Sequence, residues 1–300
     1  MTHLDSLFER SVKAAVTGLI VILCALLVQP AHATERQTLT LLDNERNWPI
    51  TPIMINGQTS RALLDTGATI ALIDDALLAF DGSNGAAHAT QVRGIGGNRV
   101  LPVTTVSTLR AGAQAWQHLR VAVNTVDAFP IQENILPVSL FQSGVIDFDF
   151  SGRTVTLYDG YPKRVRGAAR NAIKYSVHDG LIFIPVSING VSGHALIDTG
   201  STVTFINAHF AEDAEGVYRA QAAQEIRGSD LSRNELEVFK FRRMQLGNKK
   251  ISDFSIPVLD TELFAALGFE DAPMMVIGMD LLSHYRLQID RKRQRIILQR

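Results

Sequence analysis

The sequence predicts an all-β protein made of two related lobes within one chain. The tripeptide Asp-Thr-Gly occurs twice, at 65–67 and at 198–200, and each copy follows an apolar run. The residues that flank the two motifs repeat at the same separation of 133 residues. Between the motifs, alternating apolar and polar residues bounded by turn signals dominate, which is typical of strands. A duplicated β unit explains all three observations.

The duplication extends well beyond the two tripeptides. The dipeptide Asn-Gly occurs at 56–57 and again at 189–190. Residues 135–141 match 276–282 at a separation of 141, so the second copy carries about eight extra residues before this point. Two copies are too few for a solenoid, which needs three or more, and instead indicate two lobes.

Each copy begins with a hairpin, because Asn-Gly between two apolar runs is the strongest short hairpin signal. Further strands are expected at 100–109, 119–123, 154–158, 238–246 and 295–298. Short helices are expected at 74–80, 208–215 and 279–284. This balance of many strands and few helices predicts the all-β class.

The composition is that of a globular protein. The 300 residues, of which 46% are hydrophobic, are enough for a large core and two domains. The net charge of -1 does not indicate a nucleic-acid partner. The eight histidines show neither His-Glu-x-x-His nor Cys-His spacing, so no metal and no cofactor are expected.

Residues 1–33 are predicted to be a targeting segment. Arg10 and Lys13 precede an uncharged run at 14–28, and Ala-His-Ala at 31–33 fits a signal-peptidase site. The run is short for a spanning helix, which needs about 20 residues. A cleaved signal is therefore expected, and acidic residues ahead of the run leave a retained membrane anchor as the alternative. A cleaved signal would leave the protein periplasmic or secreted. A retained anchor would leave it attached to the membrane.

The remaining chain divides into an N-terminal lobe at 34–160, a linker at 161–172 and a C-terminal lobe at 173–300. Gly, Pro and four Arg or Lys residues between 159 and 171 are typical of a connecting segment. Its basic run is expected to be solvated surface.

The duplicated motif predicts a pair of carboxyl groups. If the chain brings Asp65 and Asp198 within about 3 Å, the two cannot both ionise and share one proton. Such a pair can activate a water, because one member accepts its proton while the other hydrogen-bonds the scissile carbonyl. The glycine of each motif allows a tight turn. The threonine hydroxyl can donate to a backbone carbonyl across the pair.

On these motifs the chain resembles the aspartic proteases of the retropepsin and pepsin clan. The matching elements are apolar-Asp-Thr-Gly-Ala/Ser and the apolar-apolar-Gly before a short helix at 276–282. Short lobes and Ala68 are similar to the retroviral type, whereas two motifs in one chain are similar to pepsin. The resemblance covers 36–300 and implies two retropepsin-like β-barrel lobes with an active-site cleft between them.

The resemblance also implies residue roles. It makes Asp65 and Asp198 the catalytic pair, and gives supporting roles to Thr66, Gly67, Ala68, Thr199, Gly200 and Ser201. Ala68 and Ser201 occupy equivalent positions, so we expect the Ser201 hydroxyl to donate to Asp198 and favour its charged form. Asp65 would then hold the shared proton more often.

In this family a β-hairpin flap closes over the substrate. The glycine-rich stretch with Gly94, Ile95, Gly96 and Gly97 is similar to a flap, and its counterpart contains Gly228 and Ser229. An ordinary surface turn is the alternative. Pro137 stands where the second copy has Gly278, which departs from the family pattern.

The sequence therefore predicts a monomeric aspartic endopeptidase that hydrolyses peptide bonds in a polypeptide substrate with a water activated between two aspartates. A catalytically inactive peptide-binding module on the same fold is the alternative. Asp-x-Asp at 147–149 superficially fits the nucleophile loop of haloacid-dehalogenase-type phosphatases. Strand alternation explains that pattern equally well, and its second copy lacks the first aspartate.

Overall fold

The computed structural model describes residues 36–78, 89–94, 97–125, 134–219 and 237–300. The predicted targeting segment at 1–33 lies outside the described residues. Residues 36–300 form one compact unit, built mainly of strands. The all-β prediction is confirmed.

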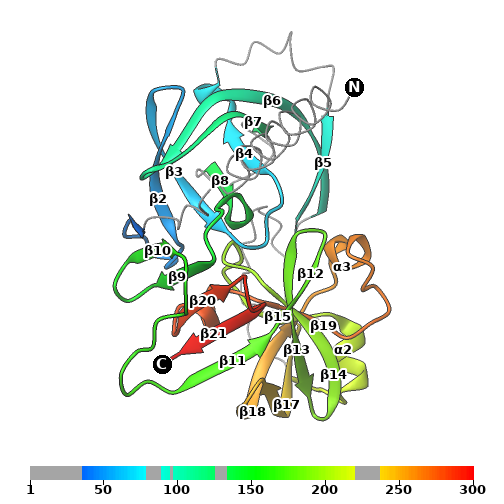
Figure 1. Ribbon diagram of the computed structural model, residues 1–300. Coiled ribbons are helices and arrows are strands. Elements are labelled where there is room, and N and C mark those ends of the chain that lie inside the picture. Colours follow the sequence, from blue (N-terminus) through cyan, green and yellow to red (C-terminus); the bar gives the residue numbers. More distant parts are fainter. Residues whose placement is uncertain (1–35, 79–88, 95–96, 126–133, 220–236) are drawn as a thin grey trace, which may run out of the picture. The chain divides into compact units, whose positions relative to one another are not determined.

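The first half of the chain forms a closed six-stranded barrel (Figure 1). Its strands, in order around the ring, are β2 (Ile50–Ile55), β3 (Gln58–Asp65), β8 (Asn134–Pro137), β4 (Ala71–Asp74), β7 (Gln114–Asn124) and β6 (Gly97–Ala111). Antiparallel pairing of β2 with β6 closes the ring. β5 (Ala89–Gly94) pairs with the first part of β6 outside it.

The second half repeats this barrel. The corresponding ring is β13 (Leu181–Ile188), β14 (Val191–Ile197), β19 (Met274–Ile277), β15 (Phe205–Ile206), β18 (Lys249–Val258) and β17 (Glu237–Leu246). Pairing of β13 with β17 closes it. β12 (Ser176–His178) and β16 (Val217–Arg219) extend the sheet beyond the ring. The predicted duplication into two retropepsin-like lobes is confirmed.

A third sheet contains strands from both halves. Its order is β1 (Gln37–Thr40), β10 (Thr154–Tyr158), β9 (Val145–Asp149), β20 (Arg286–Asp290), β21 (Arg295–Gln299) and β11 (Arg170–Lys174). The central pair, β9 and β20, joins the two halves by antiparallel pairing. This shared sheet was not predicted from the sequence, and β11 begins within the segment expected to be a linker.

Both Asn-Gly hairpins form as predicted. Asn56 and Gly57 have φ of 48° and 85°, and Asn189 and Gly190 have φ of 50° and 97°. Two successive positive φ values are what a type I′ turn requires, and its twist matches that of the flanking strands. Each turn therefore fixes the register of the strand that leads into an Asp-Thr-Gly loop.

Helices are short and lie at strand ends. The structure has η1 (Asp75–Leu77), η2 (Val138–Leu140), α2 (Ala208–Asp213), α3 (Glu262–Ala266) and α4 (Met279–Leu282). Three of them fall where helices were expected, whereas η2 and α3 were not anticipated. No helix in the described part of the chain has the length and apolar composition that a membrane span needs.

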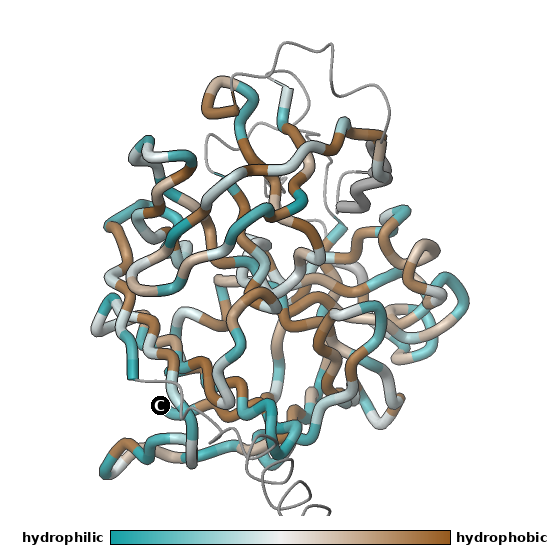
Figure 2. The backbone as a smooth tube through the Cα atoms, turned by 45° about the horizontal axis from the view of Figure 1, so that its top comes forward, coloured by the Kyte–Doolittle hydropathy of each residue, from teal (hydrophilic) through white to brown (hydrophobic). Residues whose placement is uncertain are grey.

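The core lies inside the barrels and beneath the shared sheet. Apolar stretches run along the strands, and polar stretches gather at the turns between them (Figure 2). α3 has its own small core, in which Leu263 and Phe264 pack with Phe183, Phe205 and Val276 of the second barrel. Burial of these side chains fixes α3 on its lobe.

Candidate active site

The two Asp-Thr-Gly motifs meet where the barrels face each other. Asp65 is the last residue of β3, and Asp198 directly follows β14. β3 pairs in parallel with β8, and β14 pairs in parallel with β19. The two carboxyl groups hydrogen-bond each other, and the residues are only 8% and 7% exposed. The structure thus brings together two groups that the sequence separates by 133 residues.

Thr66 and Thr199 connect the two loops reciprocally. The Thr66 hydroxyl donates to the Ile197 carbonyl at 2.7 Å, and the Thr199 hydroxyl donates to the Leu64 carbonyl at 2.7 Å. Each hydroxyl also accepts the backbone N–H of the other threonine, at 3.1 Å and 3.0 Å. Both threonines are buried, so each hydrogen bond is made away from water. These four bonds hold the aspartates in register.

Gly67 and Gly200 lie against the opposite carboxyl groups. A Cβ at position 67 would stand 2.6 Å from Cγ of Asp198, and one at position 200 would stand 2.5 Å from Oδ2 of Asp65. Neither position has room for a side chain. Glycine therefore permits each loop to approach the other lobe's carboxyl group.

Backbone N–H groups of each loop donate to the carboxyl group of the same loop. The N–H of Gly67 reaches Oδ1 of Asp65 at 2.6 Å, and Ala68 supplies a second backbone hydrogen bond. Gly200 and Ser201 donate to Oδ1 of Asp198 at 2.8 Å and 3.1 Å. Donors of this kind favour the charged form of a carboxyl group.

Burial dominates the electrostatics of the pair. It raises the pKa of Asp65 well above the ordinary aspartate value, and the nearby charge of Asp198 raises that pKa further. Burial also raises the pKa of Asp198, against the lowering effect of the Gly200 and Ser201 N–H groups. The two groups titrate together, so the raised values describe a pair that retains a proton.

The expected role of the Ser201 hydroxyl is wrong. It donates to the Val203 carbonyl at 2.8 Å, within its own loop. Only the backbone N–H of Ser201 reaches Asp198, and Ala68 supplies the same kind of bond to Asp65. The difference between Ala68 and Ser201 therefore does not act on the carboxyl pair through a hydroxyl hydrogen bond.

Each loop is supported from behind by a short helix. In the second lobe, Gly278 precedes α4, and a Cβ there would stand 2.6 Å from the Val203 carbonyl oxygen. Thr204 accepts the Gly278 N–H at 3.0 Å and donates to Asp280 at 2.6 Å. Neither Thr204 nor Asp280 was predicted from the sequence. A polar side chain at the start of an otherwise apolar helix was the available signal for Asp280.

The first lobe uses a different support. Pro137 is buried beside Asp65 in the β3–β8 register and precedes η2 with φ of -58°. Proline fits here because its ring fixes φ near this value. Arg291, from the second half, donates to the Val138 and Phe141 carbonyls at the two ends of η2. The departure from the family pattern is thus accommodated by a contact between the halves, which sequence reasoning also missed.

The described part of the glycine-rich stretch lies at one end of two paired strands. Gly94 and Gly97 are partners at the end of the β5–β6 pairing. The other residues expected in flaps, Ile95, Gly96, Gly228 and Ser229, lie outside the described residues. α3 of the second lobe contacts β5 and β6 of the first lobe (Figure 1). The first copy of the repeat has no helix predicted at the position that corresponds to α3.

Two closed barrels, each contributing one Asp-Thr-Gly loop to a shared carboxyl pair, define the two-lobed class of aspartic protease. The sequence model described as aspartyl protease matches residues 51–139 and 184–281, one region in each lobe. The chain belongs to this aspartyl protease family. No curated protein matches it.

Proposed function

We propose that this protein is an aspartic endopeptidase in which Asp65 and Asp198 share one proton and activate a water. The observation that carries the proposal is the mutual hydrogen bond of two buried carboxyl groups whose pKa values are both raised by burial. A pair of this kind offers a base and an acid side by side at the same pH. Family membership supports hydrolysis of peptide bonds.

The proposed reaction needs no covalent enzyme intermediate. The ionised carboxylate takes a proton from the water as the water oxygen bonds to the peptide carbon, and the neutral carboxyl gives its proton to the carbonyl oxygen. The tetrahedral intermediate then breaks its C–N bond. The pair protonates the leaving nitrogen and takes a proton back from the intermediate, so one shared proton remains.

Both aspartates come from one chain, so we propose a monomeric enzyme with a polypeptide substrate bound in a cleft between the lobes. The hairpin of β5 and β6 would act as a flap and pair with the extended substrate.

Residues 1–33 would direct the protein out of the cytoplasm as a cleaved signal. Mass determination of the protein's N-terminus after cell fractionation tests the location, and light scattering tests the monomer.

Cleavage profiling of a peptide library tests the activity. Wild type should cut internal bonds, with kcat/KM falling by at least about 100-fold in Asp65→Asn and in Asp198→Asn. Ala68→Ser is the matched control, because the second lobe carries serine at this position. If folded wild type binds peptides without cutting any, and Asp65→Asn binds them equally well, the protein is a binding module and the proposal is wrong.

A further inference from the structure

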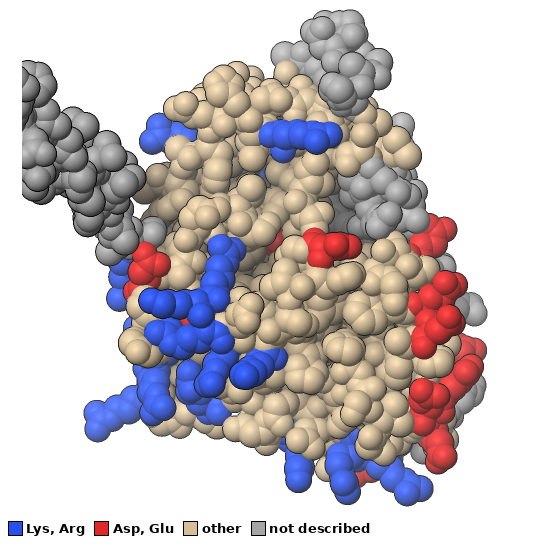
Figure 3. Space-filling model, turned by 45° about the vertical axis from the view of Figure 1, so that its right-hand side comes forward, with Lys and Arg blue, Asp and Glu red and all other residues tan. Residues whose placement is uncertain are grey.

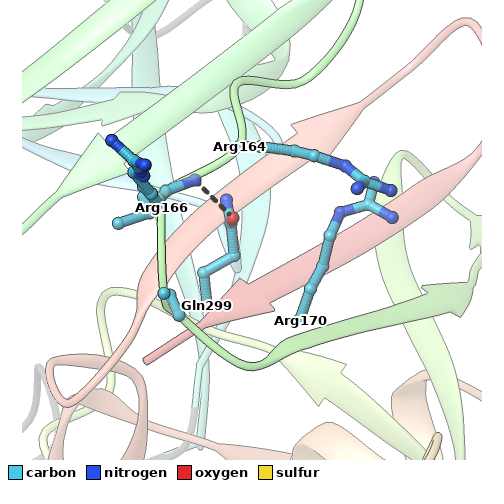
Figure 4. Close-up of a pocket in the computed structure, with 7 residues that line it drawn as sticks. Arg164, Arg166, Arg170 and Gln299 are labelled. Atoms are coloured by element: carbon cyan, nitrogen blue, oxygen red, sulfur yellow. Dashed lines mark hydrogen bonds between the residues drawn. The ribbon is translucent and has the colours of Figure 1, made fainter.

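A cavity lined by several charged and polar side chains lies on the shared sheet. It has a volume of about 440 Å³ and is lined by Arg164, Arg166 and Arg170, with Gln299 and a short stretch of backbone completing it. Arg164 and Arg166 come from the segment between β10 and β11, Arg170 is the first residue of β11, and Gln299 is the last residue of β21 (Figure 4). None of these residues takes part in the aspartate site.

The backbone of the segment before β11 is held in place by hydrogen bonds to the side chain of Gln299. The buried Gln299 side chain accepts the Val165 N–H at 2.9 Å and donates to the Lys163 carbonyl at 2.8 Å. Gln299 also donates to Gln288 at 3.0 Å, which continues into the interior of the sheet. Gly167, with φ of 79°, allows the turn that follows. The cavity wall is therefore preorganised.

The same segment is also fixed at its far end. Backbone hydrogen bonds join Ala169 and Arg300 in both directions, at 2.9 Å and 3.2 Å. Arg170 then enters β11, opposite Gln299. The hydrogen bonds on both sides fix the backbone that carries the arginines, so less backbone entropy is lost when a ligand binds.

These arginines bring positive charges to the cavity. Within the described residues, no ion pair joins Arg164, Arg166 or Arg170 to a carboxylate. Nε of Arg170 is buried and has no hydrogen-bond partner there. The guanidinium groups of Arg164 and Arg170 point toward one another (Figure 4). The two positive charges repel each other, and an anion between them would offset that repulsion. An anion could also accept a hydrogen bond from the unsatisfied Nε of Arg170.

We propose that this cavity, the arginine pocket, binds a multiply charged oxyanion of the phosphate class. Guanidinium groups present planar forks of N–H donors that match phosphate oxygens. On the face of the molecule drawn in Figure 3, Lys and Arg gather on one side and Asp and Glu on the other. The ligand is either a soluble phosphate compound or the headgroup of an anionic lipid.

Calorimetric titration of the full chain with inorganic pyrophosphate, at about 0.15 M salt to screen unspecific attraction, tests the pocket. We expect saturable binding of one pyrophosphate, weakened at least about tenfold in the double variant Arg164→Gln/Arg170→Gln. Arg295→Gln is the matched control: it removes an exposed charge at the other end of the β11–β21 pairing, away from the cavity. It should bind like wild type.

Three results would overturn the proposed pocket: no saturable binding to wild type, equal binding by the double variant, or an equal loss in Arg295→Gln.

A second experiment uses vesicles of phosphatidylcholine with and without phosphatidylglycerol. Binding only to the anionic vesicles, abolished in the double variant and by pyrophosphate, assigns a lipid headgroup. Pyrophosphate binding without vesicle binding assigns a soluble phosphate. Neither arm depends on peptidase activity, so this proposal and the proposed function can fail separately.

Discussion

Gly67 lies directly against the carboxyl group of Asp198, with a notional Cβ 2.6 Å from both Cγ and Oδ1. Gly200 stands in the same relation to Asp65. Each motif thus shapes the environment of the other motif's aspartate. The position of each aspartate carboxyl group therefore depends on a residue in the opposite lobe.

Gly67→Ala should therefore disable the site through Asp198. The added methyl group must displace a buried carboxyl group or part the two loops, and a displacement of about 1 Å can cost 100-fold in rate. We expect kcat/KM for peptide cleavage to fall at least that far while circular dichroism stays unchanged. Ala68→Ser, one residue further on, should keep most of the activity. Wild-type activity in Gly67→Ala would contradict the close approach.

Thr199→Val should loosen the connection between the lobes. Valine keeps the shape of threonine, but it loses the donor to the Leu64 carbonyl and the acceptor for the Thr66 N–H. A buried polar group left without a partner costs about 1–3 kcal/mol. Urea unfolding should report a loss of this size. Thr199→Ser, which retains the hydroxyl, should recover most of it, and equal losses in both variants would argue against the hydroxyl bonds.

The raised pKa values of the aspartates predict how stability depends on pH. Above the unfolded-state aspartate pKa the unfolded chain releases both protons, whereas the native pair retains one. Native stability therefore falls as the pH rises toward the folded-state pKa. Each unit by which the pKa is raised corresponds to about 1.4 kcal/mol.

Asp65→Asn removes this effect and should be more stable than wild type at pH 7. Thermal melts from pH 3.5 to 7.5 should show the Tm advantage of Asp65→Asn growing with pH, to several degrees at pH 7. Asp43→Asn, which removes an exposed carboxylate from a surface pair, serves as the control and should show no such growth. A Tm difference that is constant with pH would contradict the raised pKa values.

Arg286 joins the two halves of the shared sheet. It donates to both carboxylate oxygens of Asp147, at 2.7 Å and 2.9 Å, and to Asp149 at 2.8 Å. Asp147 is fully buried, so removing the arginine leaves an uncompensated charge in the interior. Breaking a buried pair in this way costs about 3–5 kcal/mol.

Arg286→Met should lower the free energy of unfolding by that amount in denaturant titrations. Arg153→Met breaks the surface pair with Asp43 and should cost less than about 1 kcal/mol. The double variant Arg286→Met/Asp147→Leu should recover part of the loss, because it removes the buried charge as well. Similar losses in Arg286→Met and Arg153→Met would show that the buried network contributes little.

Much of this architecture could be predicted from local patterns. The Asn-Gly turns, the strand that runs into Asp65 and the short helix after Gly278 depend on neighbouring residues, and the structure has each of them. The repeat itself predicted two equivalent lobes. α3 could not be predicted in this way, since its two large apolar residues are buried by a pocket of the second barrel rather than by its own sequence.

The sequence by itself determined which residues form the carboxyl pair, because duplication copies chemistry and local backbone geometry together. Only the tertiary structure decided what surrounds that pair. The Ser201 hydroxyl turns to Val203, Arg291 holds η2 behind Asp65, and strands from both halves share one sheet. These contacts join residues far apart in the chain, and the hydrogen-bond partner of a buried polar group is set by whatever folding brings beside it.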